Sequence, residues 1–206
     1  MTYLTRLVVP ALLLTVVGGC QPLPPAAITE RAIVSRTEWG AAPPVLPMVI
    51  HEPQYITIHH MAVDQRPERP LFEKLLALQT FSQKEAELGD GRVKRPWADV
   101  PYHFYIAADG AVAEARHVIY AGDTNTAYDP SGHVQIVLEG NFEHEQVTAA
   151  QWESLQWLTL ALVRQWKVPA EAIMGHRDHT PTACPGGALF SRLPELRRAA
   201  AITDRD

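Results

Sequence analysis

The segment from Thr148 to Trp166 constrains the fold most, because its pattern specifies one kind of element and one buried face. Thr148 is a typical N-terminal helix cap, and Gln151 stands three residues later, where it completes a capping box. Large apolar residues then recur at helical spacing: Trp152, Leu155, Leu158, Leu162 and Trp166. The pattern predicts an amphipathic helix with one face packed against another layer of structure.

Short apolar runs before this helix predict the strands of that other layer. These runs lie at residues 54–59, 102–107, 111–115 and 134–138, and the first is rich in β-branched and aromatic residues. Asp109-Gly110 separates the second run from the third and predicts a hairpin.

A second helix is predicted over residues 70–88, beginning at Pro70 and stopped by Gly89. Its predicted inner face consists of Leu71, Phe72, Leu75, Leu76 and Phe81. The alternation of strands and helices predicts a single α/β domain with a mixed central β-sheet flanked by helices.

The N-terminus predicts export. Arg6 precedes an apolar run over residues 7–17 that is too short to span a membrane, so residues 1–19 are expected to be a signal peptide. Val17-Gly18-Gly19-Cys20 is typical of a bacterial lipoprotein cleavage site, at which Cys20 is lipidated. An ordinary signal peptide with an incidental Cys20 is the alternative. Gln21, where Asp would be the usual signal for retention in the inner membrane, favours the outer membrane, facing the periplasm.

Residues 20–33 are then the lipidated Cys20 and a Pro-rich tether, and residues 34–206 form the folded domain. The chain has 18 Lys and Arg against 23 Asp and Glu, a net charge of −5, and loss of Arg6 with the signal peptide makes it −6. No basic stripe is present, so nucleic acid is not an expected partner. We expect a monomer that meets the membrane only through the lipid anchor on Cys20.

A loop near the C-terminus holds two candidate metal ligands. His176 and Cys184 lie eight residues apart in a stretch rich in Thr, Pro and Gly, which can bend both side chains toward one ion. If Cys20 carries lipid, it cannot form a disulfide, and Cys184 is left as a lone thiol in an oxidising compartment, where binding to a metal would protect it. A Cys20–Cys184 disulfide is the alternative. Two His and one Cys suit Zn²⁺ with an open fourth position, which is typical of a hydrolytic site.

The third candidate ligand lies in the strand that ends in His59-His60. Neighbouring side chains of a strand point to opposite faces, so at most one of the two can bind a given metal. His59 shares a face with Tyr55 and Thr57, whereas His60 shares one with Ile56 and Ile58. The more polar face favours His59 as the ligand and leaves His60 packed beside the site.

The chain resembles the zinc amidases of the peptidoglycan-recognition-protein type, whose fold is shared with phage amidase lysozymes and N-acetylmuramoyl-L-alanine amidases. The resemblance covers about residues 34–196 and rests on five blocks in family order: Ser35-Arg36-Thr37-Glu38-Trp39-Gly40-Ala41, Ile56-Thr57-Ile58-His59-His60, Trp97-Ala98-Asp99-Val100-Pro101-Tyr102-His103-Phe104, Glu139-Gly140-Asn141-Phe142 and the loop 176–186. It implies a family-like α/β fold and a Zn²⁺ cofactor held by His59, His176 and Cys184.

The resemblance also implies an activity: hydrolysis of the amide bond between N-acetylmuramic acid and L-alanine in peptidoglycan or muropeptides, during cell-wall degradation, remodelling or recycling. It places Tyr102 beside the metal as a catalytic residue. It also implies a catalytic role for Thr182, which stands where the phage enzymes carry a Lys and can donate a hydrogen bond but supplies no positive charge. A peptidoglycan-binding lipoprotein without catalysis is the alternative, and such relatives typically lose the thiol ligand.

Three further residues are candidates for contacts with a ligand imidazole or with substrate: His60, Asp178 and Asn125. The sequence departs from the family in the loop 121–127. No general base is evident, and Glu114 and Glu139 are candidates only because they stand near strand ends.

Overall fold

The computed structural model describes residues 32–88 and 91–203. The predicted signal peptide, Cys20, most of the tether and Gly89 lie outside these residues. Within the described part, no helix is long and apolar enough to cross a membrane.

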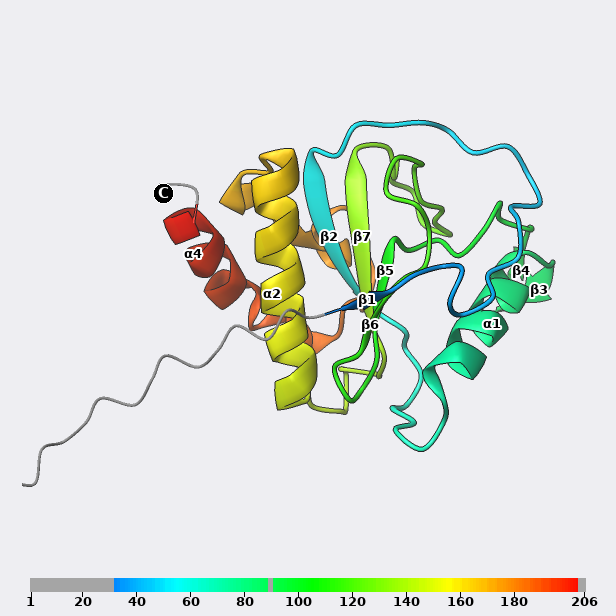
Figure 1. The fold of residues 1–206 in the computed structure, drawn as a ribbon, viewed down its shortest axis with the longest axis horizontal. Coiled ribbons are helices and arrows are strands. Elements are labelled where there is room, and N and C mark those ends of the chain that lie inside the picture. The colour runs from blue at the N-terminus through cyan, green and yellow to red at the C-terminus, as the bar shows by residue number, and fades with distance from the viewer. Residues whose placement is uncertain (1–31, 89–90, 204–206) are drawn as a thin grey trace, which may run out of the picture. The chain divides into compact units, whose positions relative to one another are not determined.

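A six-stranded mixed sheet is the centre of the domain (Figure 1). Its strands, in spatial order, are β1 (Ile33–Val34), β6 (Val112–Glu114), β5 (Phe104–Ile106), β7 (His133–Leu138), β2 (Tyr55–His60) and β8 (Ile173–Gly175). The pairs β5–β7, β7–β2 and β2–β8 are parallel, and β5–β6 is the antiparallel hairpin predicted from Asp109-Gly110. The predicted α/β class is confirmed; β1 and β8 were not predicted as strands.

The two faces of the sheet are covered by different helices (Figure 1). On one face, Ile56, Ile58 and Ile136 pack in a core with α2 (Ala149–Trp166) and α4 (Leu193–Thr203). On the other face, Val137 and Tyr105 pack in a second core with α1 (Leu71–Ser82). Thr57 and His59 belong to this second face, so polar side chains of β2 lie on the α1 side of the sheet.

The predicted helix at residues 149–166 is confirmed with its cap. Thr148 Oγ1 accepts the Gln151 N–H at 3.0 Å, and Gln151 Oε1 accepts the Thr148 N–H at 3.2 Å. Thr148 also donates its hydroxyl proton to the Ala108 carbonyl at 2.8 Å, which fixes the start of α2 on the β5–β6 hairpin. Local sequence and tertiary contacts therefore agree at this position.

The first helix is shorter than predicted, and its buried face is different. α1 ends at Ser82, because the buried ammonium of Lys94 donates to the Ser82 and Lys84 carbonyls at 2.9 and 2.7 Å. The chain then forms a small hairpin of β3 (Ala86–Glu87) and β4 (Val93–Lys94). The buried residues of α1 are Leu75, Leu78, Gln79 and Ser82, whereas Phe72, Leu76 and Phe81, predicted to be internal, are 44, 42 and 42% exposed.

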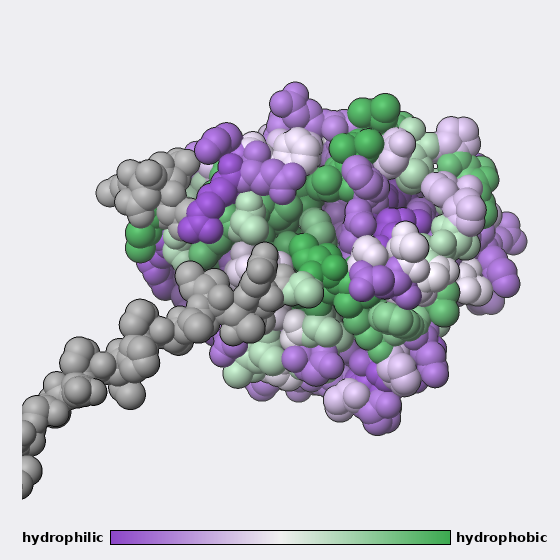
Figure 2. Space-filling view, in the orientation of Figure 1, coloured by the Kyte–Doolittle hydropathy of each residue, from purple (hydrophilic) through white to green (hydrophobic). Residues whose placement is uncertain are grey.

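Short elements complete the domain after β7. They are the 3-10 turns Ala170–Ala172 and His176–Asp178 and the short helix α3 (Gly187–Phe190). Figure 2 shows hydrophobic and hydrophilic side chains interspersed over one face of the molecule. The most exposed large apolar residues include Val49 and Ile50, at 66 and 73%.

Candidate metal centre and substrate groove

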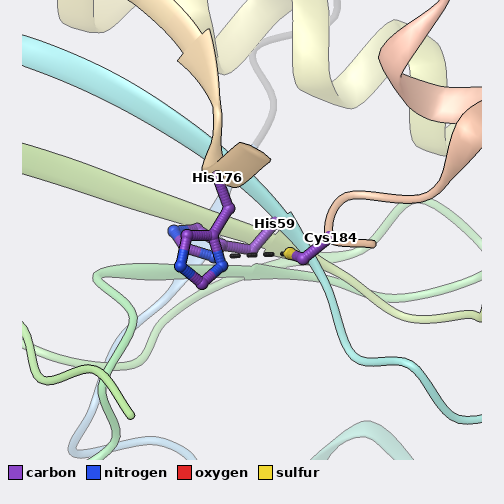
Figure 3. A group of neighbouring side chains, drawn as sticks. All are labelled: His59, His176 and Cys184. Atoms are coloured by element: carbon purple, nitrogen blue, oxygen red, sulfur yellow. Dashed lines mark hydrogen bonds between the residues drawn. The ribbon is translucent and has the colours of Figure 1, made fainter. Parts of the chain in front are cut away.

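Three predicted ligands meet at one edge of the sheet (Figure 3). His59 lies near the carboxyl end of β2, and His176 directly follows β8. Because β2 and β8 are parallel neighbours, their carboxyl ends lie at the same edge. The following loop returns Cys184 to this edge, and one ligand atom from each of the three residues lies within 4.8 Å of the other two.

The spacing of these atoms fits a tetrahedral zinc site. Cys184 Sγ lies 3.6 Å from His59 Nδ1. Zinc bonds of about 2.3 Å to sulfur and about 2.0–2.1 Å to nitrogen, at a tetrahedral angle, separate the two atoms by about 3.6 Å. His59 and His176 are 2 and 8% exposed and Cys184 is partly buried, so the two imidazoles are almost fully shielded from solvent.

The electrostatics of the cluster also fit a cation. Burial lowers the pKa of His59 well below its usual value and that of His176 to about 4, so both rings are neutral at pH 7. Burial raises the pKa of the Cys184 thiol to about 12 in the metal-free chain. A divalent ion would reverse this shift, because it binds the thiolate and neutral imidazoles.

His60 supports the thiol without joining the ligand group. Its backbone N–H donates to Cys184 Sγ at 3.4 Å, and its Nδ1 accepts the Phe142 N–H at 3.3 Å. The His60 side chain therefore points into the α2 side of the sheet.

Asp178 supports the loop rather than an imidazole. Its carboxylate accepts the Gly175 N–H at 2.8 Å and lies 3.5 Å from the Arg197 guanidinium. Within the described residues, no hydrogen bond joins Asp178 to His59 or His176.

Sequence reasoning missed the residue that does bond a ligand imidazole. Thr126 Oγ1 lies 2.8 Å from His176 Nε2. The neighbouring Tyr128 ring lies 5.2 Å from the His176 ring and stacks on His179 at 5.3 Å. From sequence, the loop 121–127 stands out only because it differs from the family pattern. It has no periodic pattern, so the sequence does not indicate which way its side chains point.

A groove of about 670 Å³ opens beside the three ligands, a size typical of ligand sites. Tyr102, Thr182 and Asn125 line it near His176 and Cys184. Farther away its wall comes from the segment before α1, from α1 itself and from the segment after β4. These contribute Arg66 and Arg69, then Lys74, Leu78 and Phe81, and then Trp97. The groove therefore offers apolar and cationic side chains next to the metal centre.

Tyr102 lies over the metal ligands. Its ring centroid is 5.1 Å from that of His59, at an interplanar angle of 53°. Burial, with smaller contributions from Cys184 and Tyr128, raises the pKa of its phenol far above the usual value. The phenol is therefore a hydrogen-bond donor over the whole physiological pH range.

Thr182 faces the same groove from the Cys184 loop. Its Oγ1 accepts the Cys184 N–H at 3.2 Å, a bond that does not use the hydroxyl proton. That proton is available to a substrate oxygen.

The two candidate general bases differ in position. Glu114 is on β6, separated from β2 by β5 and β7. Glu139 lines the groove, but its carboxylate accepts from Lys74 Nζ and from the Arg66 and Ala108 N–H groups, each at 2.9 Å. Glu139 thus holds three segments together at the groove wall.

Known proteins share both the sequence and the fold. A family model described as N-acetylmuramoyl-L-alanine amidase matches residues 50–187, about two-thirds of the chain. Peptidoglycan-recognition protein LB of Drosophila melanogaster is 26% identical over 202 residues, which cover 94% of this chain and 83% of that protein. An N-acetylmuramoyl-L-alanine amidase of Sus scrofa is 31% identical over 166 residues, 79% of this chain but only 27% of that longer protein.

A solved structure of a mutant of Drosophila peptidoglycan-recognition protein LB, in complex with tracheal cytotoxin, superposes with a TM-score of 0.63. It is 27% identical and covers 78% of this chain and 92% of its own. The match of the family model over most of the domain shows that this chain belongs to the peptidoglycan-recognition-protein and N-acetylmuramoyl-L-alanine amidase family.

Proposed function

We propose that this chain is a zinc-dependent amidase that hydrolyses the bond between N-acetylmuramic acid and L-alanine in peptidoglycan or muropeptides. The observation that carries the proposal is the thiol of Cys184 beside His59 and His176, at a spacing suited to zinc. A module that only binds peptidoglycan has no need of a partly buried thiol and two neutral imidazoles at one point of its groove. The complex of a related protein with tracheal cytotoxin also supports a muropeptide as ligand.

In the proposed reaction, different residues of the chain hold the metal, stabilise the oxyanion and bind the substrate. His59, His176 and Cys184 would hold a zinc ion, which supplies Lewis acidity toward an amide carbonyl and toward water. The protonated phenol of Tyr102 donates a hydrogen bond to the carbonyl oxygen as negative charge develops on it. Thr182 adds a neutral donor on the same side, and the groove wall along α1 binds the stem peptide and excludes water from it.

The decisive experiment measures metal content and products on the same sample. The full-length chain, purified in detergent, should contain close to one zinc per molecule. Mass spectrometry should show release of a stem peptide that begins with L-alanine from defined muropeptides. Cys184→Ser should lose most of the zinc and the hydrolysis while it keeps the circular dichroism of the wild-type chain.

The same substitution at Cys20 is the matched control, because the proposal gives Cys20 no part in zinc binding. Full zinc occupancy and full activity in Cys184→Ser would overturn the ligand assignment. Wild-type protein that binds muropeptides without cleaving them would instead identify a recognition module.

A further inference from the structure

We propose that Thr126 is a positioning residue that fixes the ring orientation and tautomer of His176, so that Nδ1 is its ligand atom. The inference rests on the proposed zinc site and assigns a role to a loop whose sequence differs from the family pattern. Thr126 Oγ1 lies 2.8 Å from His176 Nε2, a normal hydrogen-bond length. Since Nε2 is engaged in this way, Nδ1 is the nitrogen left for a metal.

The direction of the hydrogen bond follows from that ligand role. A nitrogen that binds a metal must offer a lone pair, so neutral His176 carries its proton on Nε2 and donates it to Thr126 Oγ1. The Thr126 hydroxyl can then donate a hydrogen bond to Thr124 Oγ1, 2.8 Å away. Thr124 Oγ1 also accepts the Thr126 N–H at 3.1 Å, which holds the two side chains in register.

The loop that carries Thr126 is itself held in place at both ends. Before Thr126, the Asp123 carboxylate pairs with the buried guanidinium of Arg116. At Gly122 there is no space for a side chain, because a Cβ would lie 2.4 Å from the Pro101 carbonyl oxygen.

After Thr126, the Tyr128 hydroxyl donates to Gln135 Oε1 of β7 at 3.1 Å. The Tyr128 ring lies against the His176 ring, with centroids 5.2 Å apart. The same loop thus contacts His176 through a hydrogen bond and through a ring, and both contacts restrict rotation of the imidazole.

The expected loss of zinc affinity can be estimated from other residues that hydrogen-bond a metal-binding histidine. Removal of a residue that hydrogen-bonds a metal-binding histidine typically costs about 10–100-fold in metal affinity. Thr126→Val keeps the shape of the side chain and removes the hydroxyl. We expect this variant to bind zinc about 10–100-fold more weakly in competition with a chelator, and Thr126→Ser to restore most of the affinity.

The matched control is Thr159→Val on α2. Thr159 is also buried, and its hydroxyl has no hydrogen-bond partner among the described residues, so the same substitution there should leave zinc affinity unchanged. All four proteins are compared as detergent-purified full-length chains.

A second measurement does not depend on any variant. Nitrogen-15 NMR of the metal-free wild-type chain should show His176 as the Nε2–H tautomer, and zinc should shift the Nδ1 resonance. A His176 protonated at Nδ1, or a Thr126→Val variant with wild-type zinc affinity, would overturn the inference. A wild-type chain that binds no zinc would overturn the proposed function itself, so the two failures are distinguishable.

Discussion

At the scale of single residues, a substitution at Tyr102 can distinguish a role in catalysis from a role in binding substrate or zinc. Tyr102→Phe removes one hydroxyl and keeps the ring that packs 5.1 Å from His59. If the phenol stabilises the developing oxyanion, kcat should fall by about 10²–10³-fold, while zinc content and KM change little. Steady-state kinetics on a purified muropeptide would check this.

Tyr55→Phe is the matched control for this experiment, because Tyr55 stands at the other end of β2 from His59. The control should keep full activity. An unchanged kcat in Tyr102→Phe would show that Tyr102 is only a packing residue of the groove.

The grouping of the three candidate metal ligands could be predicted from residue types, strand alternation and the resemblance to the family. The choice of His59 over His60 needed two facts: neighbouring side chains of a strand face opposite ways, and the face that His59 shares with Tyr55 and Thr57 is the more polar one. The structure brings His59, His176 and Cys184 together and turns His60 toward Phe142. Thr126 could not be predicted, because its contact with His176 joins residues 50 positions apart through a loop without periodic pattern.

At the scale of elements, the loop that carries Cys184 depends on a glycine. Gly186 has φ +88°, and a Cβ there would lie 2.5 Å from the Phe142 backbone carbon. Gly186→Ala should therefore lower the free energy of unfolding by about 1–3 kcal/mol and weaken zinc binding, because the loop must move away from Phe142. Urea denaturation and a chelator titration would measure both effects.

The adjacent Gly187 provides the matched control. Among the described residues, no atom outside Gly187's own chain neighbours and helix backbone lies within 4 Å of a Cβ built at Gly187. Gly187→Ala should therefore leave stability and zinc affinity near the wild-type values. Equal behaviour of the two variants would contradict the close docking of this loop on Phe142.

Elements whose ends are set by local sequence were predictable, and those set by distant contacts were not. The start of α2 depends on Thr148 and Gln151, three residues apart, and was predicted correctly. The end of α1 depends on Lys94, twelve residues beyond Ser82, whose ammonium takes the carbonyls that a longer helix would have used. Phe81 was assigned to the core from its helical spacing, although in the structure it lines the groove.

At the scale of the whole molecule, buried neutral histidines should make stability depend on pH. Burial lowers the pKa of His103 to about 3 and that of His133 to about 4, from 6.5. The unfolded chain takes up these protons below pH 6.5 and the folded chain does not. Stability is therefore full above pH 6.5 and is lost as the pH falls toward 3.

For His103 alone the loss between pH 7 and pH 5 is about 2 kcal/mol. Urea denaturation of the metal-free chain at several pH values would measure it. A free energy of unfolding that is the same at pH 7 and pH 5 would contradict this account.

The attachment of the protein to a membrane is a proposal that rests on the sequence of its N-terminus. We propose that Cys20 is lipidated and that the eight Pro-rich residues from Gln21 to Ile28, at about 3.1 Å each, let the domain reach about 25 Å from the membrane. Cys20→Ala should abolish the lipid and release the protein from membrane fractions or leave it uncleaved. Wild-type protein found in the soluble fraction with an unmodified N-terminus would exclude the anchor.

The candidate ligands come from β2, from the turn after β8 and from the following loop, and this has a consequence for when the site can form during synthesis. His59 and Cys184 are 125 residues apart, so the metal centre does not exist until most of the chain has been synthesised and folded. A chain truncated after Gly175 would retain all six strands of the sheet but should purify without zinc. If the chain is the amidase that we propose, a copy whose synthesis stops before Cys184 lacks one of the three zinc ligands and should be unable to hydrolyse peptidoglycan.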